Sequence, residues 1–246
     1  MTRTSTTALL LGLCLGFSAN TQADVITGPA EVSLTIVGDD GVNPTQTATA
    51  PGIGIDPSTG DFGAQDLTFG NASSPIWQVT DLDINGNADP FVNLDFTITN
   101  LSDSDADFIV SALVPISGSF PGPNPISGSL SGVVTDTSGD ETATLVSTGF
   151  TTPIFTGTVD GTDALPIGLA SFTAVGGPGA SFSFGPFIDS DPAFGPATST
   201  IGIDIAFTLS AGDTAEISSF FQLVPEPTSA MLLMVGASAV LVRRRA

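Results

Sequence analysis

The chain has 246 residues with 4 Lys and Arg, 25 Asp and Glu and no His, which gives a formal net charge of −21 at pH 7. Its basic residues lie only at the two ends, so residues 24–224 carry 24 acids, the 25 minus Glu226, and no basic side chain. This region is therefore excluded from nucleic-acid binding, whose affinity comes largely from Lys and Arg on phosphates. Repulsion among its carboxylates must be relieved by water, backbone N–H groups or solution cations.

The first 23 residues have the anatomy of a secretory signal peptide. Arg3 supplies the positive start, residues 8–17 form an apolar run, and Ala23 places a small residue at the cleavage position. The run is too short to span a membrane, and the alternative is a buried first helix. Cys14, the only cysteine, would leave with this segment, and Leu13 before it disfavours lipidation because that position should be small.

Residues 24–223 are predicted to form one all-β ectodomain, an antiparallel β-sandwich of jelly-roll-like type. In residues 92–99 and 201–209, apolar side chains alternate with polar or small ones, which places the apolar set on one face of a strand. No stretch shows helical periodicity, and 28 Gly and 18 Pro punctuate the chain. Shorter strands are expected at 32–37, 76–82, 108–114, 129–135, 143–148, 168–173, 181–187 and 217–224, with long loops at 115–127 and 175–199.

One segment within this domain has the spacing of oxygen ligands in a calcium loop. Its acids and amides are Asp81, Asp83, Asn85, Asn87 and Asp89, with Gly86 at the sixth position. This resembles the first half of a D-x-D-x-N-G loop, where the Gly permits a sharp turn. Position twelve is Val92 rather than Glu, and no helices flank the segment, so an Asn-Gly turn with solvated acids remains the alternative. Ca²⁺ is thus the one candidate cofactor.

Two further clusters of acids, at 103–107 and 136–141, are predicted to lie in solvated loops rather than to bind metal.

The C-terminal segment, residues 224–246, has the features of a membrane-inserted tail. Val224, Pro225, Glu226 and Pro227 break the preceding structure, because two prolines cannot continue a strand or a helix interior. Residues 228–242 are uncharged and are predicted to form a transmembrane helix, although 15 residues reach only ~22 Å at ~1.5 Å per residue. Arg243, Arg244 and Arg245 follow in the basic end 243–246, and a basic cluster there stays cytoplasmic.

This order of proline-acid-proline, apolar helix and arginine cluster at the chain end resembles the PEP-CTERM sorting signal. The resemblance covers about the last 23 residues and implies a Gram-negative host that makes exopolysaccharide. It also implies signal peptidase and an exosortase-type membrane protease as partners, with cleavage near Pro225. The chain would be held in the inner membrane with its ectodomain in the periplasm, and then reach the cell surface or the medium. Residues 85–100 also resemble ectodomains of other PEP-CTERM proteins, which adds no function.

The residues missing from the domain exclude most catalytic chemistry. Residues 24–224 contain no His, Cys, Lys or Tyr, so nucleophilic triads, Schiff bases and His-ligated metals are ruled out. We predict a protein that is not an enzyme, a structural or adhesive component linked to exopolysaccharide or biofilm. The alternative is a Ca²⁺-dependent carbohydrate-binding module, disfavoured by the single Trp, Trp77, which fits a core strand position. A glycosidase with two carboxylates is the remote alternative.

Overall fold

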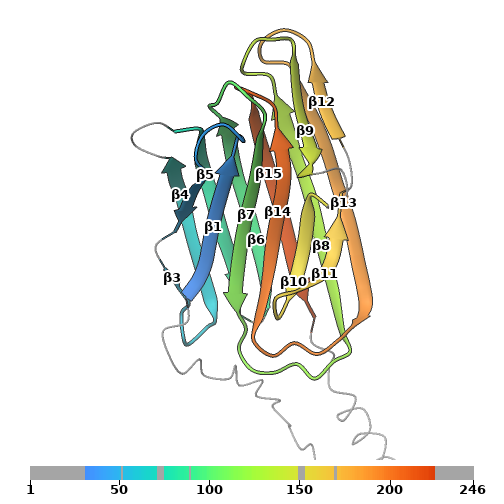
Figure 1. Ribbon diagram of the computed structural model, residues 1–246. Helices are drawn as coiled ribbons and strands as arrows, with labels where there is room; N and C mark the ends of the chain where they lie inside the picture. The colour runs from blue at the N-terminus through green and yellow to red at the C-terminus, as the bar shows by residue number, and fades with distance from the viewer. Residues whose placement is uncertain are drawn as a thin grey trace, which may run out of the picture.

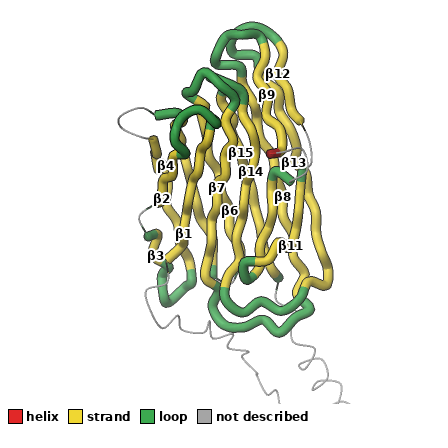
Figure 2. Tube along the Cα trace, viewed as in Figure 1, coloured by secondary structure: helices red, strands yellow, loops and turns green. Residues whose placement is uncertain are grey.

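The computed structural model describes residues 31–50, 52–70, 75–88, 90–148, 153–168 and 171–224. These residues form two antiparallel β-sheets that pack face to face around one apolar core, with no α-helix among them (Figures 1 and 2). The predicted all-β, antiparallel class is thereby confirmed. The described residues include no helix with the length and hydropathy that a membrane span needs.

The first sheet has nine strands in the order β11-β10-β14-β7-β1-β2, with β9 paired to β14, β12 paired to β9, and β3 paired to β1. Its strands are β1 (Glu31–Asp39), β2 (Gln46–Thr49), β3 (Ile53–Gly54), β7 (Ala106–Pro115), β9 (Thr142–Ser147), β10 (Phe155–Val159), β11 (Thr162–Ile167), β12 (Ser171–Val175) and β14 (Thr200–Leu209). The second sheet has six strands in the order β13-β8-β15-β6-β5-β4. They are β4 (Asp61–Gly70), β5 (Trp77–Asn87), β6 (Phe91–Asn100), β8 (Asn124–Thr135), β13 (Ser181–Phe194) and β15 (Thr214–Leu223).

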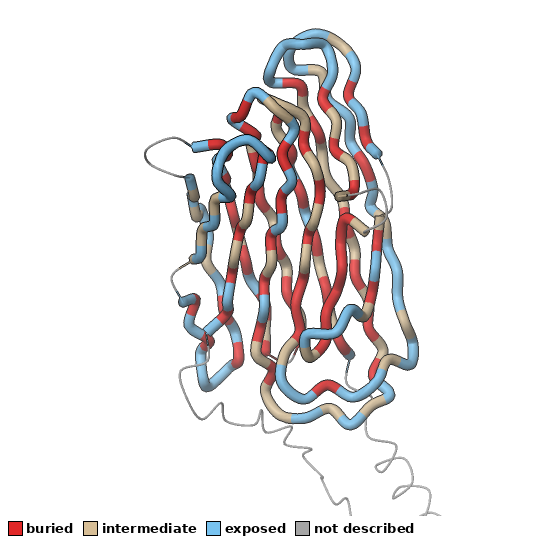
Figure 3. The backbone as a smooth tube through the Cα atoms, in the orientation of Figure 1, coloured by how far each residue is buried: buried red, intermediate tan, exposed pale blue. Residues whose placement is uncertain are grey.

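The core follows the alternation in the sequence, and Figure 3 shows buried and more exposed residues taking turns along the strands. In β6 every second residue from Val92 to Ile98 is buried, and β14 buries Phe207 and its apolar neighbours in the same way. Phe rings join the layers: the Phe172 and Phe184 centroids, from β12 and β13, lie 4.2 Å apart with stacked planes. Phe therefore fills the core of a chain that has no Tyr.

The structure overturns part of the loop prediction. Most of the segment 175–199 forms β13, a 14-residue edge strand paired with β8. Two register shifts, near Phe184 and Asp191, interrupt its pairing, and Pro186 and Pro192 lie within it. The strand expected at 181–187 is therefore confirmed as the first half of β13. Bulges and prolines are typical of protected edge strands and also break the period of two, so the pattern did not show the full length of the strand. The predicted loop 115–127 likewise ends inside β8, which begins at Asn124.

Candidate functional site

An open cleft lies at one end of the sandwich, where three separate segments meet. It has a volume of about 790 Å³ and is lined by the start of β2 and the turn before it, by the start of β5 and by the turn after β6. Its polar lining residues are Asn43, Thr45, Gln46, Thr47, Ser102 and Asp103. Amides and hydroxyls dominate this set and can both donate and accept hydrogen bonds. The cleft is therefore suited to an uncharged polar ligand.

Trp77 also lines the cleft, and its indole N–H is buried. Its side chain is 1% exposed, and its indole nitrogen Nε1 has no hydrogen-bond partner in the part of the chain that the structure describes. A Cβ atom on Gly38 would lie 2.5 Å from Nε1, so the missing side chain at Gly38 makes room for the indole. Because the ring is buried, it is not a platform on which a sugar could stack. A buried indole N–H normally finds an acceptor, so the absence of one among the described residues is unusual in a residue that lines the cleft.

Short hydrogen bonds fix the polar side chains on the β1–β2 side of the cleft. The Asn43 amide donates to Asp40 Oδ2 at 2.6 Å, and Thr45 Oγ1 donates to Asp39 Oδ2 at 2.9 Å. Hydrogen bonds from Asn43, first from its side chain and then from its backbone N–H, hold the pKa of Asp40 below its ordinary value. This turn therefore keeps an ionised carboxylate as the fixed acceptor that orients the cleft residues.

The opposite side of the cleft depends on a buried asparagine. Asn100 is 0% exposed, and its Oδ1 accepts hydrogen bonds from Ser102 Oγ at 2.7 Å and Ser102 N at 3.0 Å. Its side-chain amide donates to Leu209 O at 3.0 Å, which joins this turn to the end of β14. These hydrogen bonds of Asn100 thereby hold Ser102 in a fixed position at the cleft.

The structure corrects one part of the calcium prediction, because residues 81–87 belong to strand β5 rather than to a loop. Asp81, Asp83, Asn85 and Asn87 alternate along the outer face of this strand, while the residues between them are buried. Neighbours on one face of a strand lie ~7 Å apart, whereas oxygens around one Ca²⁺ lie ~2.4 Å from it. The four side chains therefore form a row and do not surround a common point.

Each of three predicted ligands already has a lateral partner. Asp83 Oδ1 accepts the backbone N–H of Asp66 at 2.9 Å. Asn85 Oδ1 accepts from the Asn93 amide at 2.9 Å, and the Asn87 amide donates to Asp61 Oδ1 at 2.6 Å. Asp81 has a positive φ of 51° where the pairing of β5 with β6 shifts register. Asp89 lies outside the described residues, so calcium at 81–89 stays a prediction.

Gly86 is explained by packing rather than by a turn. A Cβ atom here would lie 2.5 Å from the Phe62 ring, and it would also collide with the backbone oxygen of Phe91. Only a glycine lets β6 and the ring approach so closely. The resemblance to the glycine of a calcium loop therefore has a structural cause unrelated to metal.

The predicted sorting residues fall mostly outside the described part of the chain: Ala23, Pro225, Glu226, Pro227, Arg243, Arg244 and Arg245. Val224 is described, directly after β15, and its N–H donates to Pro125 O at 2.7 Å. The sorting signal stays a prediction.

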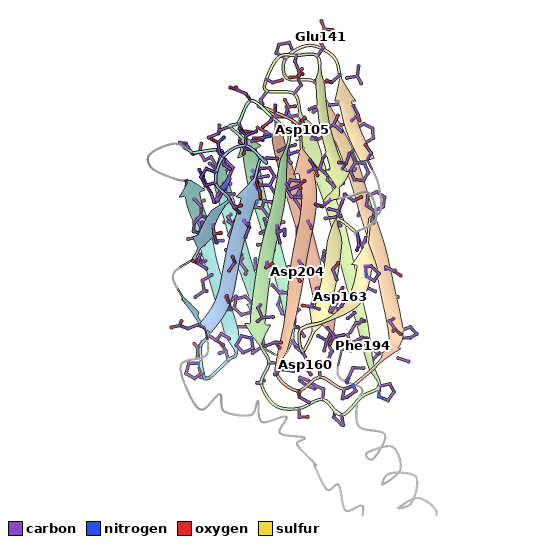
Figure 4. All side chains as sticks on the ribbon, viewed as in Figure 1. Asp105, Glu141, Asp160, Asp163, Phe194 and Asp204 are labelled. Atoms are coloured by element: carbon purple, nitrogen blue, oxygen red, sulfur yellow. The ribbon has the colours of Figure 1, made fainter. Side chains whose placement is uncertain are left out.

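Three acids have structural roles that the sequence pattern did not show. Asp160, in the turn between β10 and β11, accepts five hydrogen bonds from residues 198–200. Asp136 and Asp213 are both 0% exposed, whereas Asp140 and Glu141 are exposed, as expected for the solvated loop predicted at 136–141. The structure places Asp160 and Glu141 at opposite ends of the sandwich (Figure 4). A local cue exists for Asp160, since Asp-Gly is typical of a tight hairpin turn.

Comparisons with known proteins show no family for this chain. No family model matches it, and no curated protein matches it. Among solved structures, TmCBM61 in complex with β-1,4-galactotriose is 13% identical with a TM-score of 0.26, over 61% of this chain and 88% of that one. The infectious bursal disease virus Gx strain structure is 11% identical with a TM-score of 0.20, over 82% and 58%. TM-scores this low carry no argument for a shared fold or ligand.

Proposed function

We propose that this chain is an exported, non-catalytic adhesive protein of the cell surface or extracellular matrix, which holds a neutral polysaccharide in the cleft beside Trp77. The observation that carries the proposal is a cleft of about 790 Å³ lined by amides and hydroxyls, beside the buried Trp77, whose indole N–H has no partner among the described residues. Sugar hydroxyls both donate and accept, so they match this lining.

The charge of the domain selects among polysaccharides. Residues 24–224 carry 24 acids, the 25 of the chain minus Glu226, and no Lys, Arg or His. Such a surface repels anionic polymers and offers no cation to bind a uronate or sulfate group. A neutral glycan meets neither difficulty, so we expect neutral polysaccharides to bind and anionic ones to be rejected.

The cleft also favours binding over hydrolysis. Among the described residues, its lining contains one carboxylate, Asp103, whereas most glycosidases use a pair of carboxylates on either side of the scissile bond. The lining residues include no other side chain with acid-base function near neutral pH. An adhesive role follows from this chemistry, with export through the PEP-CTERM tail as the route to the matrix.

Intrinsic fluorescence tests the proposal directly, because Trp77 is the only Trp and the chain has no Tyr. We expect neutral polysaccharides such as dextran, mannan or galactan to change the emission of Trp77 in a saturable way, and alginate to leave it unchanged. Thr47→Phe places a ring in the cleft and should abolish the change. Thr49→Phe is the matched control, since Thr49 is exposed on the same face of β2 but does not line the cleft.

Trp77→Phe removes the N–H and keeps an aromatic side chain in the core. Loss of one hydrogen bond should weaken binding by ~2- to 10-fold, measured by affinity electrophoresis in polysaccharide-containing gels. Binding that is equal in the wild type and in Thr47→Phe would show that glycans, if bound, do not occupy this cleft.

A further inference from the structure

Three turns meet at one end of the sandwich and enclose two carboxylates. They are the turns between β8 and β9, between β12 and β13, and between β14 and β15. Asp136 N donates to Ala180 O at 2.9 Å, and Gly179 N donates to Asp136 O at 2.7 Å. Thr137 Oγ1 donates to Gly212 O at 2.7 Å. These bonds fix the first turn to both of the others.

The two carboxylates, Asp136 and Asp213, are each 0% exposed and flank one serine. The backbone N–H of Ser138 donates to Asp213 Oδ1 at 3.2 Å, and its hydroxyl donates to Asp136 Oδ1 at 3.2 Å. Ser138 itself is exposed, so the pair lies directly beneath the surface. The structure thus places two buried acids beneath one exposed turn, with Ser138 in contact with both.

The hydrogen bonds of the two carboxylates are unequal. Asp213 is satisfied at both oxygens, since Oδ1 also accepts from Thr137 N at 3.1 Å and Oδ2 accepts from Ser210 Oγ at 2.5 Å. Asp136 Oδ1 accepts from Gly139 N at 2.7 Å, but its Oδ2 is buried and has no hydrogen-bond partner among the described residues. A buried carboxylate oxygen without a partner is costly, so it indicates a missing positive group.

No side chain of the domain can supply that positive group, because residues 24–224 contain no Lys, Arg or His. We propose that Asp136 and Asp213 hold one Ca²⁺ ion, with Asp136 Oδ2 as the ligand that now lacks a partner. Two carboxylates balance the charge of one divalent cation. Ca²⁺ accepts mixed carboxylate, hydroxyl and carbonyl oxygens in a flexible geometry, whereas Mg²⁺ requires a near-octahedral site.

The remaining ligands of such a site are neutral. The described residues contain no group of three or more acidic, His or Cys side chains that could hold a metal, so the two carboxylates have no third acidic partner. The Ser138 hydroxyl already contacts Asp136 and is a neutral side-chain oxygen on the exposed side of the pair. Water can complete the coordination through this exposed turn.

Equilibrium dialysis of the full-length chain in detergent against radioactive Ca²⁺ tests the proposal. We expect one bound Ca²⁺ per chain, which Mg²⁺ and Na⁺ at matched ionic strength do not displace. Asp136→Asn and Asp213→Asn should each abolish this binding. Asp140→Asn is the matched control, because Asp140 is exposed in the same turn as Asp136. Ser138→Ala removes the hydroxyl that donates to Asp136 from an exposed residue, so it should leave the fold intact and weaken binding on the order of tenfold. It keeps the test valid if the buried variants do not fold.

Three results would overturn the proposal. In the first, the wild type binds no Ca²⁺. In the second, Ser138→Ala and folded Asp136→Asn keep the full affinity for Ca²⁺ and Asp83→Asn loses that affinity, which would assign the ion to β5. In infrared spectra, the carbonyl band of a protonated carboxylic acid could persist at neutral pH in the presence of Ca²⁺ and vanish in Asp136→Asn. Asp136 would then be neutral and satisfied by a proton.

Discussion

Asp160 provides a test of whether hydrogen bonds to carboxylates stabilise this domain, which has no basic side chain to pair with them. Its Oδ2 accepts from Thr198 N at 2.8 Å and Thr198 Oγ1 at 2.9 Å. Its Oδ1 accepts from Ser199 N at 2.7 Å, Ser199 Oγ at 2.8 Å and Thr200 N at 3.0 Å. One carboxylate thereby ties the β10–β11 turn to the start of β14 (Figure 4).

The substitution Asp160→Asn keeps one acceptor oxygen and the tolerance of Asn for the positive φ of 51° at this position. The new amide nitrogen takes the place of one oxygen and cannot accept a hydrogen bond. If the remaining oxygen keeps the three hydrogen bonds from Ser199 and Thr200, the two hydrogen bonds from Thr198 are lost. At about 1 kcal/mol for each hydrogen bond, the free energy of unfolding should fall by ~2 kcal/mol. For a domain of this size, that lowers the melting temperature by ~4–8 °C.

The pH dependence has a definite sign. Burial is the largest single influence on the Asp160 pKa and raises it, but the hydrogen bonds from Thr200, Ser199 and Thr198 together outweigh burial and hold the pKa well below its ordinary value. The unfolded chain, with an Asp pKa of ~3.9, takes up its proton first as the pH falls. The stabilisation by Asp160 is therefore complete above about pH 5 and decreases below about pH 4 toward the folded pKa.

Thermal melts of the wild type, Asp160→Asn and Asp163→Asn at pH 7 and at about pH 3 measure this effect. Asp163 is exposed on the neighbouring strand β11, so its variant reports the general relief of charge repulsion. We expect a gap between the wild type and Asp160→Asn at pH 7 that narrows at low pH, with Asp163→Asn close to the wild type throughout. Equal melting of the wild type and Asp160→Asn at pH 7, or a gap independent of pH, would refute the reasoning.

Four further predictions concern packing, charge and the chain ends. Gly157→Ala places a Cβ atom against the Phe221 ring and should cost ~1–3 kcal/mol in urea unfolding, whereas Gly54→Ala, with nothing within 4 Å, should be near neutral. NaCl should raise the melting temperature by screening unpaired acids, and a melting temperature insensitive to ionic strength would contradict this. Mass spectrometry of the exported protein should show a start near Asp24 and no terminal arginines, and an intact end at Ala246 would exclude tail processing. Neutral replacements of the arginines should weaken membrane retention and orientation.

The sequence by itself was enough to predict the all-β class, because strands with one face toward water show a clear alternation of apolar and polar residues. The alternation in β6 and β14 predicted both strands, because a period of two fixes which side chains reach the core. It failed for β10, which is buried at all five positions and so has no polar face. It also failed for β4, whose pairing with β5 shifts register twice and leaves most side chains exposed.

Composition was equally decisive for what the domain cannot do, since the absence of Lys, Arg and His follows from the sequence alone. Only the tertiary structure decided where the remaining groups act. The cleft combines residues near positions 45, 76 and 102, whose closeness depends on long-range pairing between strands and has no local signature. Asp136 and Asp140 lie in one turn, yet one is buried and the other exposed. Their difference arises because two distant turns close over Asp136, which is a property of the assembled sandwich.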